Sequence, residues 1–204
     1  MLMKLFTIKE QLRGITGKYD RYIVPCGRFL IALFTFIVIN SSLGFMTKLK
    51  NPFVSILLAI ICAFLPSGAL VLFSSLLILG HIFALSIELG IVVFIIFFVL
   101  LVIYFRFASS GGYISVLTTV FFTIRMPYLI PFIAGLTMNI FSFIPVCIGI
   151  FTFYLIRFAQ KYDKKIVEMT AANIMDNVNY IIEGLFNNKG MMAFCLVFSV
   201  TIIL

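Results

Sequence analysis

The chain has 204 residues, of which 63% are hydrophobic and 11% are charged, and its mean hydropathy is +1.23. An ordinary soluble domain is about 45–50% apolar and about 25% charged. This composition therefore excludes a typical soluble globule and predicts an all-α, polytopic integral membrane helical bundle with Pro-broken helices, held in a lipid bilayer. The formal net charge of +8 does not indicate nucleic acid as a partner, because the basic residues flank apolar runs, as the positive-inside rule expects.

Residues 1–21 are predicted to form an amphipathic helix that lies in the membrane interface. Leu5, Ile8 and Leu12 recur at helical spacing, and Lys9 lies on the other side of the helix. Such a helix commonly lies in the plane of the interface. An arm that binds a partner protein is the alternative.

The first membrane span is predicted from Tyr22 to Met46, which is long enough to cross a bilayer with some tilt. It lacks a convincing cleavage site, so we expect a retained span and not a signal peptide. Arg28 near its start is expected to reach back to the lipid head groups. Six basic residues precede or open this span and predict a cytoplasmic N-terminus: Lys4, Lys9, Arg13, Lys18, Arg21 and Arg28.

Two breaks divide the next part of the chain. Pro66 separates an apolar segment at 52–65 from another at 67–85. The first segment reaches only ~21 Å as a helix, so these residues form either two short crossings or a re-entrant hairpin. In the following span Glu88 and Arg106 are 18 positions apart, which predicts one charge at each interface.

The most interrupted apolar stretch follows a turn at residues 109–112. A short segment from Tyr113 to Ile124 stops at Arg125-Met126-Pro127, and the run from Tyr128 to Phe158 is too long for one straight span. Four residues are the expected places of a kink or an unwound turn: Pro131, Gly135, Asn139 and Pro145. Residues 22–158 are thus predicted to form a membrane domain of about six short or broken spans.

Residues 159–190 are predicted to form a cytoplasmic amphipathic helix and loop. An apolar stripe between Ile166 and Leu185 is flanked by charged residues, so the helix either lies on the membrane or docks a partner. Residues 191–204 are predicted to begin a further transmembrane helix. We expect this last helix to be completed by a partner subunit or by a longer chain.

Five polar residues are the candidate ligand or pathway residues: Arg125, Asn139, Ser142, Glu88 and His81. Arg125 beside Pro127 is expected near the free N–H groups of the next half-helix, which favours an anionic ligand; the alternative is an interfacial loop. Asn139 and Ser142 either add polar contacts to the same break or bridge neighbouring helices.

His81 and Glu88 are seven positions apart and would share one face of a continuous helix. A protonatable pair inside a bundle could relay protons or bind a cation. The alternative is that the two residues flank an interfacial turn near Ser86.

The sequence lacks the phosphate-binding loop, the zinc-binding helix and the nucleophile elbow. A single histidine does not favour a histidine-based metal site. The four cysteines occur singly in apolar runs and are expected to be small buried hydrophobes. We therefore expect neither an enzyme nor a bound cofactor or metal, and no motif identifies a family.

The leading hypothesis is an integral membrane subunit of a transport or export assembly in a bacterial inner membrane. Its broken helices would line a pathway, and other membrane or cytoplasmic subunits, or an ion gradient, would supply the energy. The competing hypothesis is a non-transporting scaffold subunit of a membrane complex. A polar cavity that reaches Arg125 or Glu88 would favour transport, and a dry bundle with a broad apolar face would favour scaffolding.

Overall fold

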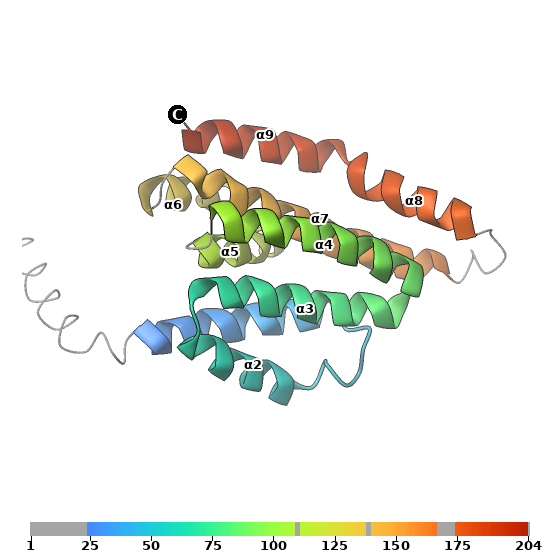
Figure 1. Ribbon diagram of the computed structural model, residues 1–204, viewed down its shortest axis with the longest axis horizontal. Coiled ribbons are helices and arrows are strands. Elements are labelled where there is room, and N and C mark those ends of the chain that lie inside the picture. Colours follow the sequence, from blue (N-terminus) through green and yellow to red (C-terminus); the bar gives the residue numbers. More distant parts are fainter. Residues whose placement is uncertain (1–23, 109–110, 138–139, 167–173, 204) are drawn as a thin grey trace, which may run out of the picture.

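The computed structural model describes residues 24–108, 111–137, 140–166 and 174–203, and the regular elements in these ranges are helices. The helices lie side by side along the long axis of the molecule (Figure 1). Five are long and apolar enough to cross a membrane: Val24–Leu43, Ser67–Leu85, Ile87–Phe107, Phe143–Lys164 and Asn177–Ile203. The predicted helical membrane bundle is therefore confirmed, whereas the predicted 1–21 helix lies outside the described residues.

We call the two ends of the bundle the Val24 end and the Leu43 end, after the first and last residues of the Val24–Leu43 helix. Helix α2 (Pro52–Phe64) runs back along it, because Asn40 donates to Ser55 Oγ near one end and Arg28 donates to the Leu65 carbonyl near the other. Residues 52–64 therefore connect opposite ends of the bundle. This agrees with two short crossings, whereas in a re-entrant hairpin the segment would turn back to the end where it began. Arg28, which is expected to reach the head groups, donates this bond to Leu65, the C-cap residue of α2.

Proline and asparagine set the limits of α2. The Asn51 side chain accepts a hydrogen bond from the Phe53 N–H at 3.1 Å, and Pro52 occupies the first helical position, where its missing N–H costs nothing. At the other end Leu65 is extended before Pro66, as a residue preceding proline prefers. Helix α3 (Ser67–Leu85) then begins after Pro66 and crosses to the Leu43 end.

Helix α4 (Ile87–Phe107) returns to the Val24 end after a turn at Ser86. The Ser86 hydroxyl caps α4 by accepting from the Leu89 N–H at 3.4 Å. Glu88 lies in the first turn and Arg106 in the last, where each charge complements the helix dipole. The expected placement of the two charges at opposite ends of one span agrees with this helix.

A re-entrant hairpin follows. Helix α5 (Gly112–Thr123) enters from the Val24 end, and α6 (Leu129–Thr137) returns to it after the break at residues 124–128. The 3₁₀ turn η2 (Ile140–Ser142) leads into α7 (Phe143–Ile166), which runs parallel to α5 and packs closely on it.

The prolines of this region begin helices and do not kink them. Pro131 and Pro145 are each the third residue of their helix, and the first turn of a helix has no intrahelical acceptor for their missing N–H groups. The breaks therefore lie just before them. Gly135, also expected to allow a kink, stays inside α6.

The segment before Val24 and residues 159–190, both predicted to be cytoplasmic, connect to opposite ends of the bundle. The Gln160 side chain of α7 donates to the Ser42 carbonyl at 2.5 Å, which places this part of α7 at the Leu43 end (Figure 1). The reason is the α5–α6 hairpin, which enters and leaves at one end and adds no crossing. The cytoplasmic placement of both segments stays a prediction.

Helix α8 (Ile174–Phe186) packs on α4 and α7 of its own chain. Its Ile181 and Leu185 are buried, and its Tyr180 ring packs on Tyr162 at a centroid distance of 6.4 Å. Two residues of the predicted apolar stripe, Ile181 and Leu185, are thus buried within the chain. After Asn187 and Asn188 the chain continues into α9 (Lys189–Ile203), which leads back toward the Val24 end.

Candidate functional site

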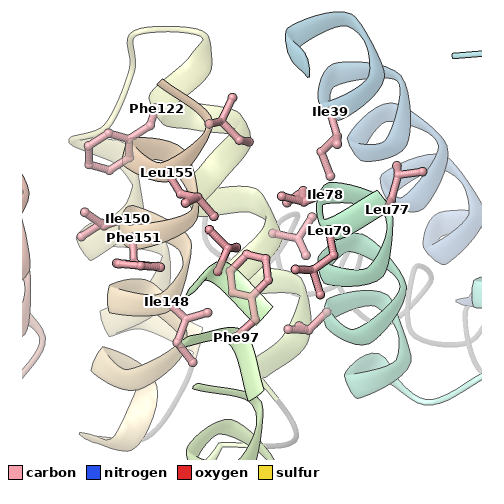
Figure 2. Packing of buried hydrophobic residues seen from close by; sticks show 14 of the residues in the cluster. Ile39, Leu77, Ile78, Leu79, Phe97, Phe122, Ile148, Ile150, Phe151 and Leu155 are labelled. Atoms are coloured by element: carbon pink, nitrogen blue, oxygen red, sulfur yellow. The ribbon is translucent and has the colours of Figure 1, made fainter. Parts of the chain in front are cut away.

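A small cavity lies between five elements near the middle of the bundle. Its volume is about 30 Å³ of space open to the centres of water molecules. It is lined by Thr35, Ile39, Val71, Ser74, Ser75, Ile78, Phe97, Leu100, Leu101, Ser115, Val116, Thr119, Ile148 and Thr152. Four of its apolar walls, Ile39, Ile78, Phe97 and Ile148, converge from the Val24–Leu43 helix, α3, α4 and α7 (Figure 2).

Five of the six hydroxyl residues of the lining, all but Ser115, donate hydrogen bonds to backbone carbonyls. Thr35 donates to Ile31 at 2.8 Å, and Thr152 donates to Ile148 at 2.8 Å. Ser74 and Ser75 donate to the carbonyls of Val71 and Leu72 at 2.9 and 2.8 Å. Thr119 donates to the Gly149 carbonyl of the neighbouring helix at 3.1 Å.

These bonds fix the donor and acceptor roles of the five hydroxyls. A carbonyl oxygen only accepts, so each hydroxyl must be the donor and keeps its lone pairs for another partner. The hydroxyls of Thr35, Ser74, Ser75, Thr119 and Thr152 therefore keep the capacity to accept a further hydrogen bond, while the other lining residues are mostly apolar. All lining residues are uncharged.

Close contact between α5 and α7 holds one wall of the cavity in place. Gly149 lies against the Ser115 carbonyl and the Thr118 side chain, where a Cβ atom at position 149 would overlap both. Small residues at such a contact let two membrane helices approach closely. The break after Thr123 keeps α5 short, and Ser115 and Thr119 face the cavity from this half-crossing.

His81 belongs to a separate buried network at the Leu43 end. The Met46 N–H donates to His81 Nδ1 at 3.2 Å, so Nε2 carries the proton and donates to Asn40 Oδ1 at 2.7 Å. Asn40 in turn donates to Ser55 Oγ at 2.8 Å. This chain of bonds holds a neutral imidazole and connects the Val24–Leu43 helix, α2, α3 and the 44–51 loop.

Glu88 is not a partner of His81 in this network. His81 lies on α3, whereas Glu88 follows the Ser86 turn in the first turn of α4 and is half-buried. The two residues thus flank a turn, which was the alternative to a relay on a continuous helix.

Arg125 ends α5 in a left-handed conformation, with φ of 67°. The Met126 N–H bonds to the Phe121 carbonyl at 2.9 Å and the Arg125 N–H to the Phe122 carbonyl at 3.2 Å, which is the Schellman pattern with Arg125 at the position usually held by glycine. Pro127 then prevents the helix from continuing. Arg125 is exposed and is not part of the cavity lining.

The remaining predicted residues are also outside the cavity. Ser142 is buried in η2 at the start of α7, and Asn139 lies outside the described residues. The serines and threonines of the lining are not among the residues predicted from the sequence, which are mainly charged or titratable. Their signal was present as hydroxyl residues at mid-helix positions of otherwise apolar spans.

The described residues contain no group of three or more histidine, cysteine, aspartate or glutamate side chains placed to hold a metal ion. Comparison with known protein families, curated proteins and solved structures found no significant match. The function is therefore argued from the cavity and the helices around it.

Proposed function

We propose that the protein is a membrane subunit of a transport assembly and that the central cavity belongs to its pathway. The observation that carries this proposal is a set of acceptor hydroxyls from four helices around one cavity in the middle of the span. Polar groups are costly in a lipid-embedded core. Six hydroxyl residues meet at one cavity whose other eight lining residues are apolar, and this supports a partly polar path.

The re-entrant α5–α6 hairpin supports the same function. Non-helical backbone at membrane depth is tolerated where protein or a water-filled cavity covers it, and transporters build their sites from such discontinuous helices. Here the half-crossing α5 contributes Ser115 and Thr119 to the cavity. The cavity reaches neither Arg125 nor Glu88, so the proposal rests on the hydroxyl groups and not on those charges.

A scaffold subunit is the second candidate, and the exposure of α9 favours it. In the most apolar part of the span Asn177–Ile203, which includes α9, only 11% of the residues are buried within the chain. The corresponding share for α3 is 56%. Leu196 and Val200 are among the exposed apolar residues of α9. Lipid would cover this face in a transport subunit that stands alone, and helices of another subunit would cover it in a scaffold.

Cysteine accessibility distinguishes the two candidates in native membranes. In a variant whose four native cysteines are alanine, Ser115→Cys and Thr119→Cys should react with a small water-soluble thiosulfonate if the cavity belongs to a hydrated pathway. Thr118→Cys is the matched control, because Thr118 is fully buried beside Thr119 and does not line the cavity. Equal lack of reaction at all three positions would contradict transport and favour the scaffold.

The sidedness of the bundle is part of the proposal. Seven basic residues precede or lie at the Val24 end, namely Lys4, Lys9, Arg13, Lys18, Arg21, Arg28 and Arg106. Six occur at the Leu43 end, namely Lys48, Lys50, Arg157, Lys161, Lys164 and Lys165. By the positive-inside rule the Val24 end is cytoplasmic, and labelling of Lys48→Cys from outside the cell would test it.

A further inference from the structure

We infer that Cys147 of α7 and Cys195 of α9 bind a soft monovalent metal ion between the two helices, with the chemistry of Cu(I) or Ag(I). Neither cysteine lines the central cavity, so this inference goes beyond the proposed function and does not depend on it. The contact between the thiols, the number of ligands and the position of the pair each support it.

The two thiols meet where α7 and α9 pack against each other. The thiols of Cys147 and Cys195 lie within hydrogen-bonding reach of one another. Ser199 follows Cys195 by four positions and therefore lies on the same face of α9, and its Oγ lies 3.5 Å from Cys147 Sγ. Two sulfur atoms and one oxygen thus meet at one place, and Cys147 Sγ contacts the other two.

The hydrogen bonds of these three residues show which protons a metal ion would replace. The Ser199 hydroxyl donates to the Cys195 carbonyl at 2.6 Å, so the Cys147 thiol donates to Ser199 Oγ. In the thiol pair Cys195 is then the donor to Cys147 Sγ. A metal ion that binds both sulfurs breaks two S–H bonds, forms two metal–sulfur bonds and releases two protons to water, and no oxidation state changes.

The ligand set selects a soft ion of low coordination number. Thiolate ligands select Cu(I) and other soft metals, whereas calcium and magnesium bind oxygen. Structural zinc takes four ligands in a tetrahedron. In the part of the chain that the structure describes, no third histidine, cysteine, aspartate or glutamate joins the two thiols. Two sulfur ligands satisfy Cu(I) and Ag(I), so the pair fits these ions better than zinc.

The position of the pair gives an ion a short way in from water. Cys147 is the fifth residue of α7, and Ser199 lies four residues before the last residue of α9. The pair therefore lies about 6 Å, or about one helical turn, from the Val24 end. Both cysteines are half-buried. The complex of one monovalent ion with two thiolates carries one negative charge, which costs less near a membrane interface than at the bilayer centre.

Retention of Cu(I) by the purified full chain in detergent micelles tests the inference. The reduced protein is loaded with Cu(I) without oxygen and titrated with bicinchoninate, which becomes coloured when it removes the ion. We expect one Cu(I) per chain to be retained at chelator concentrations that remove the ion from glutathione, a competitor with a single thiol. Removal from the chain at the same concentrations would overturn the inference.

Serine variants locate the ion. Cys147→Ser and Cys195→Ser each keep the side-chain shape and remove one sulfur ligand. Loss of an outer-shell group costs a metal site about 10–100-fold in affinity, so loss of a ligand should weaken Cu(I) binding by at least about tenfold. Cys26→Ser is the matched control, because Cys26 is exposed on another helix, and it should keep the wild-type affinity. Unchanged affinity in both ligand variants would place the ion elsewhere and overturn the inference.

Protection of the native thiols tests the same site without a substitution. Diamide should join Cys147 to Cys195 in the metal-free chain. One equivalent of Ag(I), which diamide does not oxidise, should suppress this disulfide, and one equivalent of Zn(II) should not. Equal yields of the linked peptides with and without Ag(I) would overturn the inference, even where a serine variant fails to fold. The accessibility test at positions 115 and 119 uses a chain without native cysteines, so failure of the transport proposal is recognised separately.

Discussion

Substitution of Gly149 by alanine should separate α5 from α7 and destabilise the bundle. A Cβ atom at position 149 would lie 2.5 Å from Thr118 Cβ and would overlap the Ser115 backbone carbonyl. Ordinary contacts of a Cβ atom begin at 3.4 Å, so the two helices must move apart by about 0.9 Å. Backbone and Cβ atoms cannot rotate away as a flexible side chain would.

The magnitude follows from this displacement. The Thr119 Oγ to Gly149 O distance of 3.1 Å would become about 4.0 Å if the helices separated along this contact, which is too long for a hydrogen bond. An interhelical bond in a membrane contributes about 0.6–1.7 kcal/mol, and overpacking costs about 1–3 kcal/mol. Gly149→Ala should therefore lower the free energy of unfolding by about 2–4 kcal/mol.

Reversible unfolding in mixed micelles, followed by circular dichroism, measures this change. Gly135→Ala and Gly27→Ala are matched controls, because a Cβ atom at either position meets nothing within 4 Å. Each control should raise stability by about 0.5–1 kcal/mol through the helix preference of alanine over glycine. A Gly149→Ala variant as stable as the controls would refute the close α5–α7 contact.

Three further predictions concern the polar and strained positions outside the cavity. His81→Leu leaves the buried Asn40 Oδ1 and the half-buried Met46 N–H without their partner and should cost about 1–3 kcal/mol in the same unfolding assay. No loss would mean that the network is not formed. Arg125→Gly relieves a left-handed arginine and should raise stability by about 1 kcal/mol, whereas a decrease would show that the side chain makes a stronger contact. The thiols of Cys147 and Cys195 lie within hydrogen-bonding reach across α7 and α9, so diamide should join these two, as detected by mass spectrometry of the linked peptides, and a different cysteine pair would contradict the α7–α9 packing.

Composition and proline placement predicted the fold class and most helix limits, because each depends on local physics. A chain this apolar needs lipid as its solvent, and Pro66 and Pro127 stop helices wherever they fall. The number of crossings could not be predicted in the same way. Residues 113–158 contain enough apolar length for two crossings, and only the packing of α5 parallel to α7 shows that the first part turns back.

The candidate site was harder to predict. A titratable residue in an apolar sequence suggests a functional site, even where the surrounding structure gives it another role. Arg125 is conspicuous in an apolar sequence, yet it serves as the C-terminal residue of an α5 cap. Thr35, Ser74 and Thr152 are individually ordinary, since serine and threonine commonly bond to the preceding turn of a membrane helix. These residues become candidates for a site only because helices distant in the sequence bring them to one cavity. A single sequence does not show which helices pack together.

The two buried polar systems of the bundle differ in what they leave unused. In the His81 network each donor meets an acceptor: the Met46 N–H donates to the imidazole, the imidazole donates to Asn40, and Asn40 donates to Ser55. Such a closed chain fixes loops and helices relative to one another and has no demand for a ligand. Five of the cavity hydroxyls donate to backbone carbonyls and can still accept a hydrogen bond from a water or a ligand in the cavity. Function is therefore expected where the acceptors remain unmatched, and the histidine, the more conspicuous residue, is expected to act in structure alone.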